Sequence, residues 1–163
     1  MFDKRAKKYG KLFTIMTFYK EKTLEEMNKE EWEALCDGCG RCCLVKLEDE
    51  DSGEILCSDV HCSLFDAKTC KCSDYEGRKE KVPDCVKLNA QNIKEISWIP
   101  PTCAYLRIAN GKGLAWWHPL VAGDDKAMKE IGVCVFGKVV SEDDVEHEDY
   151  VKHIVDWPNS EPE

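Results

Sequence analysis

The sequence predicts a small α+β domain, irregular and cysteine-rich, organised around thiolate metal centres and flanked by helices. Three observations support this fold class. Ten of the eleven cysteines of the 163-residue chain lie between Cys36 and Cys103. That stretch shows little hydrophobic periodicity, which is the main signal of regular secondary structure. Helix-start and strand-like patterns occur on either side of it, so we expect conventional elements there to supply the hydrophobic core.

Two helix-start signals precede the first cysteine. Thr23 with Glu26, and Asn28 with Glu31, each place an oxygen-bearing cap three residues before a glutamate. This is the pattern of a capping box. The second signal predicts a short helix whose last turn delivers Cys36, and the glycines that follow are expected to end it.

Patterns after Cys103 predict four further elements. They are a strand over residues 105–109 that ends at the Asn110-Gly111 turn, a helix over 124–131, a strand over 132–140, and a last helix capped by Ser141. We expect the last helix to carry an apolar edge of Val151, Ile154 and Val155.

Charge is distributed unevenly along the chain, which carries a net charge of -9. Residues 1–20 hold six basic groups and one acidic group, whereas residues 141–163 hold nine acidic groups and one basic group. An acidic body repels phosphate backbones, so we expect no nucleic-acid partner. The basic N-terminal extension, residues 1–21, is interpreted as a solvated arm, with contact to an anionic partner as the alternative.

No apolar run approaches the roughly 18 residues that a membrane-spanning helix requires, so we expect no membrane association. The short apolar run Leu12–Phe18 follows basic residues but precedes charged ones rather than a small-residue cleavage site. We therefore expect a cytoplasmic protein. Thiols stay reduced in that compartment, and a dense cluster of reduced thiols indicates a metal or redox function.

The strongest local motif is C-D-G-C-G-R-C-C, in which Cys36, Cys39, Cys42 and Cys43 fall within eight residues. Two-residue gaps let successive thiolates converge on one metal, and the glycines let the backbone turn tightly. Adjacent cysteines tend to diverge, so Cys42 and Cys43 either serve two metals or include one bystander. More distant cysteines would complete the ligand shell: Cys62, Cys70, Cys72, Cys85 and Cys103.

The identity of the metal stays open between zinc and iron or an iron-sulfur cluster. Zinc and iron-sulfur clusters both accept four thiolates, and C-x-x-C-x-x-C begins the bacterial ferredoxin run. The fourth ferredoxin cysteine would stand four residues after Cys42, where this chain has Lys46. A disulfide framework is the alternative to metal binding, and the odd number of cysteines argues against it.

The remaining candidates have structural interpretations. Cys134 is expected to be a buried inert thiol, and Cys57 is ambiguous. His61 is expected at the surface, whereas His118 is the best candidate for a functional imidazole, with packing in an aromatic cluster as the favoured alternative. There is no phosphate-binding glycine loop, H-E-x-x-H pair or nucleophile elbow, which favours a non-catalytic protein.

Several motifs recur together in one family. They are C-D-G-C-G-R-C-C, T-C-K-C-S-D-Y at residues 69–75, V-P-D-C at 82–85, W-I-P-P-T-C-A-Y at 98–105 and W-W-H-P-L at 116–120. Together they resemble the YcgN-type cysteine-cluster proteins, bacterial relatives of the YkgJ group of zinc- or iron-chelating domains. The likeness runs from about Lys22 to Trp157. A single cysteine-cluster domain over residues 22–157 would then be followed by an acidic tail, residues 158–163.

The resemblance implies a small cytosolic metal-binding protein whose biochemical role is not established. Its ligands would be Cys36, Cys39, Cys42, Cys43, Cys62, Cys70, Cys72, Cys85 and Cys103, whereas Cys57 and Cys134 stand outside the family pattern. A similar cluster occurs in flagellin lysine methylases. An enzyme or accessory factor in protein modification, with a possible protein partner, is therefore the alternative function.

Overall fold

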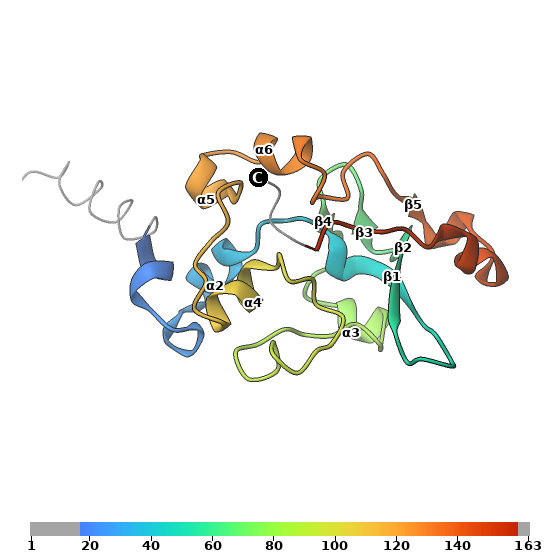
Figure 1. The fold of residues 1–163 in the computed structure, drawn as a ribbon, viewed down its shortest axis with the longest axis horizontal. Helices are drawn as coiled ribbons and strands as arrows, with labels where there is room; N and C mark the ends of the chain where they lie inside the picture. The colour runs from blue at the N-terminus through green and yellow to red at the C-terminus, as the bar shows by residue number, and fades with distance from the viewer. Residues whose placement is uncertain (1–16, 160–163) are drawn as a thin grey trace, which may run out of the picture.

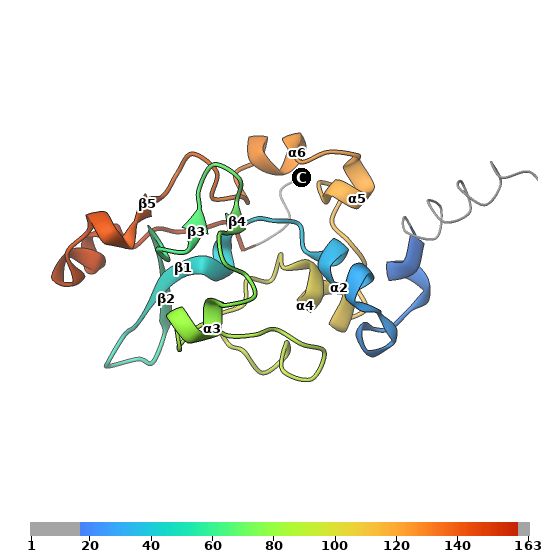
Figure 2. The same cartoon turned by 180° about the vertical axis from the view of Figure 1, so that it is seen from behind.

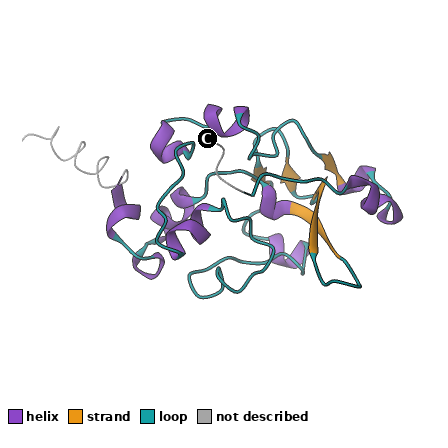
Figure 3. Ribbon diagram, in the orientation of Figure 1, coloured by secondary structure: helices purple, strands orange, loops and turns teal. Residues whose placement is uncertain are grey.

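In the computed structural model, residues 17–159 form a domain of short helices, short strands and long connecting loops (Figure 1). Most helices lie toward one end of the molecule and the strands toward the other (Figure 3). This mixture confirms the predicted α+β class. Residues 1–16, which contain most of the predicted basic extension and apolar run, and residues 160–163 of the acidic tail lie outside the described residues.

Both predicted helix starts are confirmed. Residues 17–21 are helical, and the 3-10 helix η1 (Leu24–Glu26) and the helix α2 (Lys29–Leu35) follow. The Asn28 side-chain oxygen accepts from the Glu31 N–H at 2.9 Å, and the Glu31 carboxylate accepts from the Asn28 N–H at 3.0 Å. Two otherwise unpaired backbone donors are satisfied in this way. The helix ends at Cys36, as predicted.

The strand predicted over residues 105–109 is wrong, because these residues belong to the helix α4 (Ala104–Ala109). Tyr105 stacks on Trp32 of α2 with ring centroids 4.3 Å apart, and its hydroxyl donates to the Trp32 carbonyl at 2.8 Å. The two helices lie side by side when viewed from behind (Figure 2). The Asn110-Gly111 pair ends the helix, with Gly111 at a φ of 70°, instead of forming a hairpin turn.

The helix predicted over residues 124–131 is confirmed as α6 (Lys126–Glu130), but the strand predicted over 132–140 is reduced to β5 (Val140–Ser141). Three successive residues, Val133, Cys134 and Val135, are all buried. A strand with one solvated face would bury alternate residues. The apolar run instead forms a loop that inserts between two parts of the core.

The predicted last helix is replaced by two 3-10 helices, η3 (Glu142–Asp144) and η4 (His147–His153). Ser141 does act as a cap, since its hydroxyl accepts from the Asp143 N–H at 3.3 Å. The expected apolar edge is not packed, because Val151 is 62% exposed and Ile154 and Val155 are also exposed. That part of the prediction is wrong.

Strands also occur inside the stretch for which little regular structure was expected. β1 (Leu44–Glu48) pairs antiparallel with β2 (Ile55–His61), and β2 pairs parallel with β5. The turn between β1 and β2 depends on the Asp49 carboxylate, which accepts from the Ser52 N–H at 2.7 Å. A second, two-stranded sheet consists of β3 (Phe65–Asp66) and β4 (Lys71–Cys72).

The core is divided into three clusters rather than one. The first lies around Phe18, Leu35 and Tyr105, the second around Trp117 and Met128, and the third around Leu44, Phe65 and Trp157. Partly buried cysteines pack against all three. The remaining short helices are η2 (Arg41–Cys43), α3 (Arg78–Lys81) and α5 (Pro119–Ala122). Within residues 17–159 no helix has the length and apolar character needed to cross a bilayer.

Candidate metal centre

The C-D-G-C-G-R-C-C motif forms a tight loop between α2 and β1. Gly38 and Gly40 both have positive φ, at 75° and 77°, which glycine adopts without steric cost. The Asp37 carboxylate accepts from the Cys39 N–H at 3.0 Å. The loop then enters η2, which carries Cys42 and Cys43.

Contacts from distant segments hold this loop in place. The Val135 N–H donates to the Cys39 carbonyl at 2.9 Å, and the Cys62 N–H donates to the Cys43 carbonyl at 2.9 Å. A Cβ atom built on Gly40 would lie 2.6 Å from side-chain carbons of both Phe65 and Val135. The backbone at Gly40 is therefore in close contact with the third core cluster, and no larger residue fits there without displacing these side chains.

Four thiols gather on one side of the motif and are called the first thiol group: Cys36, Cys39, Cys42 and Cys103. Burial raises the pKa of Cys36 and Cys39, and the negative charge of Asp37 raises both further. Burial also raises the pKa of Cys103 to about 11, and the charges of Asp37 and Cys42 add to this shift. Each of these thiols is thus close enough to the others for their charges to interact.

Four other thiols lie near one another and are called the second thiol group: Cys43, Cys62, Cys72 and Cys85. The pKa of Cys43 is raised by its hydrogen bond to Cys42, by burial and by the charges of Cys62 and Cys72 among others. Burial raises the pKa of Cys62, and the charges of Glu142, Cys72 and Cys85 raise it further. Cys43 comes from η2, Cys72 from β4, and Cys62 and Cys85 from loops.

The two groups meet at the adjacent pair Cys42 and Cys43, whose sulfur atoms lie 3.9 Å apart. The pKa of Cys42 is lowered, first by its hydrogen bond with Cys43 and also by the charge of Lys46. The Lys46 ammonium donates to the carbonyl oxygens of Leu44 at 2.7 Å and Cys42 at 3.1 Å. A fixed positive charge therefore lies where the two groups meet.

The donor set fits a thiolate metal centre in its chemistry. All eleven cysteines are free, and each group supplies the four sulfurs that zinc or an iron-sulfur cluster requires. Among residues 17–159, however, no three Cys, His, Asp or Glu side chains converge closely enough to hold one ion. Protonated thiols gain little by converging, whereas a cation that replaces their protons draws the sulfurs together. Binding therefore requires the cysteine side chains to turn toward a shared centre.

The ninth predicted ligand, Cys70, is placed elsewhere. The Cys70 sulfur lies 3.9 Å from the sulfur of Cys134. Cys134 is 1% exposed, which confirms the prediction that it is buried. Cys57 pairs with Lys46 in the β1–β2 ladder and also lies near Arg41. It therefore lies next to the thiol groups without belonging to either.

The histidines have structural partners. His118 is 1% exposed, and it bonds through Nε2 to the Leu35 carbonyl at 2.8 Å and through Nδ1 to the Leu120 N–H at 3.0 Å. His61 is buried rather than at the surface as predicted, and its ring meets Phe65 edge-on. The two hydrogen bonds to backbone groups account for the position of the His118 ring, and the contact with Phe65 accounts for that of the His61 ring, without a ligand.

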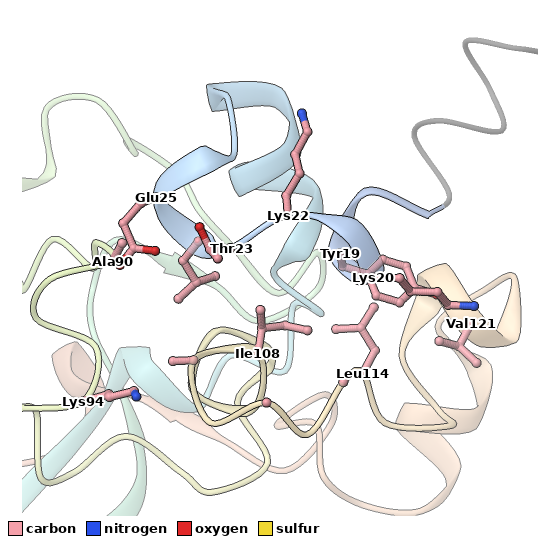
Figure 4. Close-up of a pocket in the computed structure, with 14 residues that line it drawn as sticks. Tyr19, Lys20, Lys22, Thr23, Glu25, Ala90, Lys94, Ile108, Leu114 and Val121 are labelled. Atoms are coloured by element: carbon pink, nitrogen blue, oxygen red, sulfur yellow. The ribbon is translucent and has the colours of Figure 1, made fainter.

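A groove of about 740 Å³ has Tyr19, Lys20, Ile108, Leu114 and Val121 among its lining residues (Figure 4). A smaller cavity of about 370 Å³ lies between α2 and α3. Neither of these two cavities is lined by a cysteine or a histidine. The thiol groups are therefore separate from both.

Sequence reasoning missed the charged residues around the thiols. Asp37 and Arg41 lie within the motif itself, and Lys46 stands at the position of the missing fourth ferredoxin cysteine. The Arg41 guanidinium, which is 3% exposed, donates to Thr102 Oγ1 at 3.3 Å and Asn159 Oδ1 at 2.8 Å. The only available signal was the proximity of these charges to the cysteines along the chain.

A small α+β scaffold with clustered free thiols defines a cysteine-cluster domain of the metal-chelating class. Comparison with family models agrees, since the family CxxCxxCC, described as "Putative zinc- or iron-chelating domain", matches residues 35–104. The match covers the C-D-G-C-G-R-C-C motif and all nine predicted ligands, from Cys36 to Cys103. The metal-chelating class is therefore supported independently of the thiol geometry.

Whole-length relatives identify the family. The chain is 52% identical to a UPF0260 protein of Parvibaculum lavamentivorans over 146 residues, covering 90% of this chain and 95% of the relative. It is 52% identical to one of Sinorhizobium fredii over 143 residues, covering 88% and 92%, and 54% identical to one of Rhodopseudomonas palustris over 142 residues, covering 86% and 84%. The chain belongs to the UPF0260 family. No solved structure matches it.

Proposed function

We propose that this protein binds zinc or iron through cysteine thiolates and acts as a non-catalytic protein of the cytosol. The observation that carries the proposal is the division of eight of the nine predicted ligands into two groups of four. Four thiolates complete a structural zinc site or a cubane iron-sulfur cluster. The free state of all the cysteines supports a reducing compartment.

The division gives Cys42 and Cys43 separate roles. Because adjacent side chains diverge, two neighbouring cysteines rarely bind the same ion, and here one belongs to each group. Two centres would then lie beside one another, with Lys46 close to both. The positive charge would offset part of the negative charge that four thiolates place around each metal.

Metal binding would add folding energy to a domain that has a divided core. The bound metal supplies positive charge that replaces the thiol protons and fixes the sulfurs in one arrangement. The first thiol group would join the motif to Cys103, and the second would join it to Cys62, Cys72 and Cys85. The protein's own contribution is to hold these sulfurs near one another, and burial contributes to raising the pKa of five of them: Cys36, Cys39, Cys43, Cys62 and Cys103.

The alternative, a role in protein modification, has no specific observation in its favour among residues 17–159. Both ring nitrogens of His118 are engaged by backbone groups, and neither cavity described above reaches the thiols. Placement with the YcgN-type proteins is also part of this proposal. It is supported by the W-W-H-P-L and W-I-P-P-T-C-A-Y motifs in the sequence.

Anaerobic purification with elemental analysis and absorption spectroscopy tests the proposal. We expect either colourless protein with about two zinc ions per chain or brown protein with iron and acid-labile sulfide. Cys39→Ser and Cys72→Ser should each remove the metal of one group, about half of the total. Cys57→Ser is the matched control, since Cys57 lies beside both groups, and it should keep the full metal content.

Two results would contradict the proposal. The first is folded protein that holds no metal while its thiols stay free, because the domain would then fold without the metal centres that the proposal assigns to it. The second is equal metal content in Cys39→Ser, Cys72→Ser and wild type, which would mean that these sulfurs do not bind the metal.

A further inference from the structure

Cys70 and Cys134 form a thiol pair whose members belong to neither thiol group. Their sulfur atoms are 3.9 Å apart although 64 positions separate them in the chain. Cys70 lies just before β4, and Cys134 lies in the buried loop after α6. Cys42 and Cys43, whose sulfurs are also 3.9 Å apart, are by contrast neighbours in the chain.

The backbone at Cys70 is held in an unusual conformation. Among residues 17–159 it is the only non-glycine residue with positive φ, at 54°. Such a conformation is unfavourable for a residue with a side chain and persists only where the surroundings impose it. Here β3 and β4 impose it, since Asp66 pairs with Lys71 and Phe65 with Cys72 on either side of the turn.

Cys134 is fixed from the other side. Its sulfur accepts a hydrogen bond from the Phe136 N–H at 3.4 Å, and the next residue, Val135, is bonded to the Cys39 carbonyl. The two sulfurs therefore face each other from two anchored loops. A disulfide has an S–S distance of about 2.05 Å, so closure needs a movement of roughly 2 Å shared between two side chains.

We propose that Cys70 and Cys134 are a redox-active dithiol that forms a reversible disulfide with a small-molecule disulfide as the oxidant. Cys70 is half-buried whereas Cys134 is fully buried, so Cys70 meets the oxidant first. This role is separate from metal binding, and it removes Cys70 from the metal-ligand set.

The exchange balances with oxidised glutathione as the oxidant. The Cys70 sulfur loses its proton and attacks one glutathione sulfur, which breaks the glutathione S–S bond and releases one reduced glutathione. The Cys134 sulfur, losing its proton, then attacks the Cys70 sulfur and releases the second reduced glutathione. The two protein thiols lose two electrons and two protons, and both are gained by the two glutathione molecules released.

The position of the pair couples it to both thiol groups. Cys72 of the second group follows Cys70 by two residues, and the Cys134 loop is bonded to Cys39 of the first group through Val135. A disulfide here would tie the β3–β4 turn to that loop, close a large ring of chain and reduce the freedom of the unfolded state. We therefore expect oxidation to raise the melting temperature.

Peptide mapping of the as-purified protein tests this inference. The protein is treated with oxidised glutathione, remaining thiols are alkylated, and the chain is cut with trypsin after lysine and arginine. We expect Thr69–Lys71 and Glu130–Lys138 to appear as one linked peptide, lighter by two hydrogen atoms than the separate peptides together. Dithiothreitol should separate them. Metal content measured on the same sample tests the proposed metal binding separately, so failure of one proposal can be distinguished from failure of the other.

Variants provide a second readout. Cys70→Ser and Cys134→Ala should each abolish the linked peptide and the rise in melting temperature on oxidation, while Cys57→Ser should retain both. The inference is overturned if Cys70 and Cys134 remain open to alkylation after oxidation. It is equally overturned if either one links to a cysteine of the thiol groups instead.

Discussion

The Nε2 atom of His118 donates a hydrogen bond to the carbonyl oxygen of Leu35 at 2.8 Å. Nδ1 accepts from the Leu120 N–H, which can only donate, so the proton of the neutral ring is assigned to Nε2. His118 thus caps α5 and at the same time holds the residue just before Cys36. A fully buried imidazole positions the start of the cysteine motif without reaching the sulfurs.

Replacing His118 separates these two roles. In His118→Asn, the shorter side chain can still accept from the Leu120 N–H but cannot reach Leu35, whereas His118→Ala loses both bonds. We expect a loss of about 1 to 2 kcal/mol in the free energy of unfolding for Asn and about 2 to 4 kcal/mol for Ala. Urea titration of the metal-loaded protein measures both, and equal losses would mean that the cap contributes nothing.

The stability of the wild type should also fall in mild acid through His118. Burial is the largest cause that lowers its pKa below 6.5, so the folded state binds this proton less readily than the unfolded state. The stabilisation is therefore complete above about pH 6.5 and declines as the pH falls toward the lower folded pKa. His118→Asn lacks the titrating group. Its unfolding free energy should change less than that of wild type between pH 7 and pH 6, and parallel curves would refute this.

Gly38 and Gly40 form a matched pair for testing the motif backbone. Both have positive φ, but a Cβ on Gly38 meets nothing within 4 Å, whereas one on Gly40 would lie 2.6 Å from Phe65 and Val135. We expect Gly38→Ala to cost about 1 to 2 kcal/mol from backbone strain alone. Gly40→Ala adds overpacking and should cost about 2 to 5 kcal/mol. Thermal unfolding compares them, and similar melting temperatures would argue against the close contact.

Lys46 should influence both folding and metal affinity. Its ammonium bonds to the carbonyls of Leu44 and Cys42 and lies 4.3 Å above the Trp98 ring. Lys46→Met removes these contacts and a positive charge, so we expect a loss of about 2 to 3 kcal/mol in stability. We also expect roughly tenfold weaker metal binding in a chelator competition. Lys71→Met, which changes an exposed lysine beside Cys72, should leave both quantities close to wild type.

Arg41 connects the motif to the end of the described chain. Its guanidinium donates to Thr102, to the Pro158 carbonyl and to Asn159. Arg41→Met and truncation after Trp157 should each cost about 2 to 3 kcal/mol, since each removes charge-assisted hydrogen bonds. The two changes combined should cost less than the sum of the separate losses. Strict additivity in urea titrations would show that the contacts with residues 158 and 159 contribute nothing.

Local signals were sufficient for the capping box at Asn28 and for the end of α2 at Cys36, because the bonds involved join residues three or four positions apart. They failed at residues 105–109. The β-branched and aromatic residues there suit a strand, but stacking of Tyr105 on Trp32, 73 positions away, favours a helix. Burial of Val133, Cys134 and Val135 in succession likewise reflects contacts with distant loops.

The amino-acid sequence was enough to show that ten of the cysteines lie between Cys36 and Cys103 and that four of them share one short motif. Spacing along the chain constrains only sulfurs that are close in sequence, so it did not show which distant cysteines join them. Only the tertiary structure decided which distant cysteines lie near each part of that motif. It brought Cys103 near Cys36 and Cys42, it brought Cys62 near Cys72 and Cys85, and it placed Cys70 beside Cys134. The physical reason is that contacts between distant cysteines depend on how long loops pack between separate core clusters. The local sequence around each cysteine does not determine that packing.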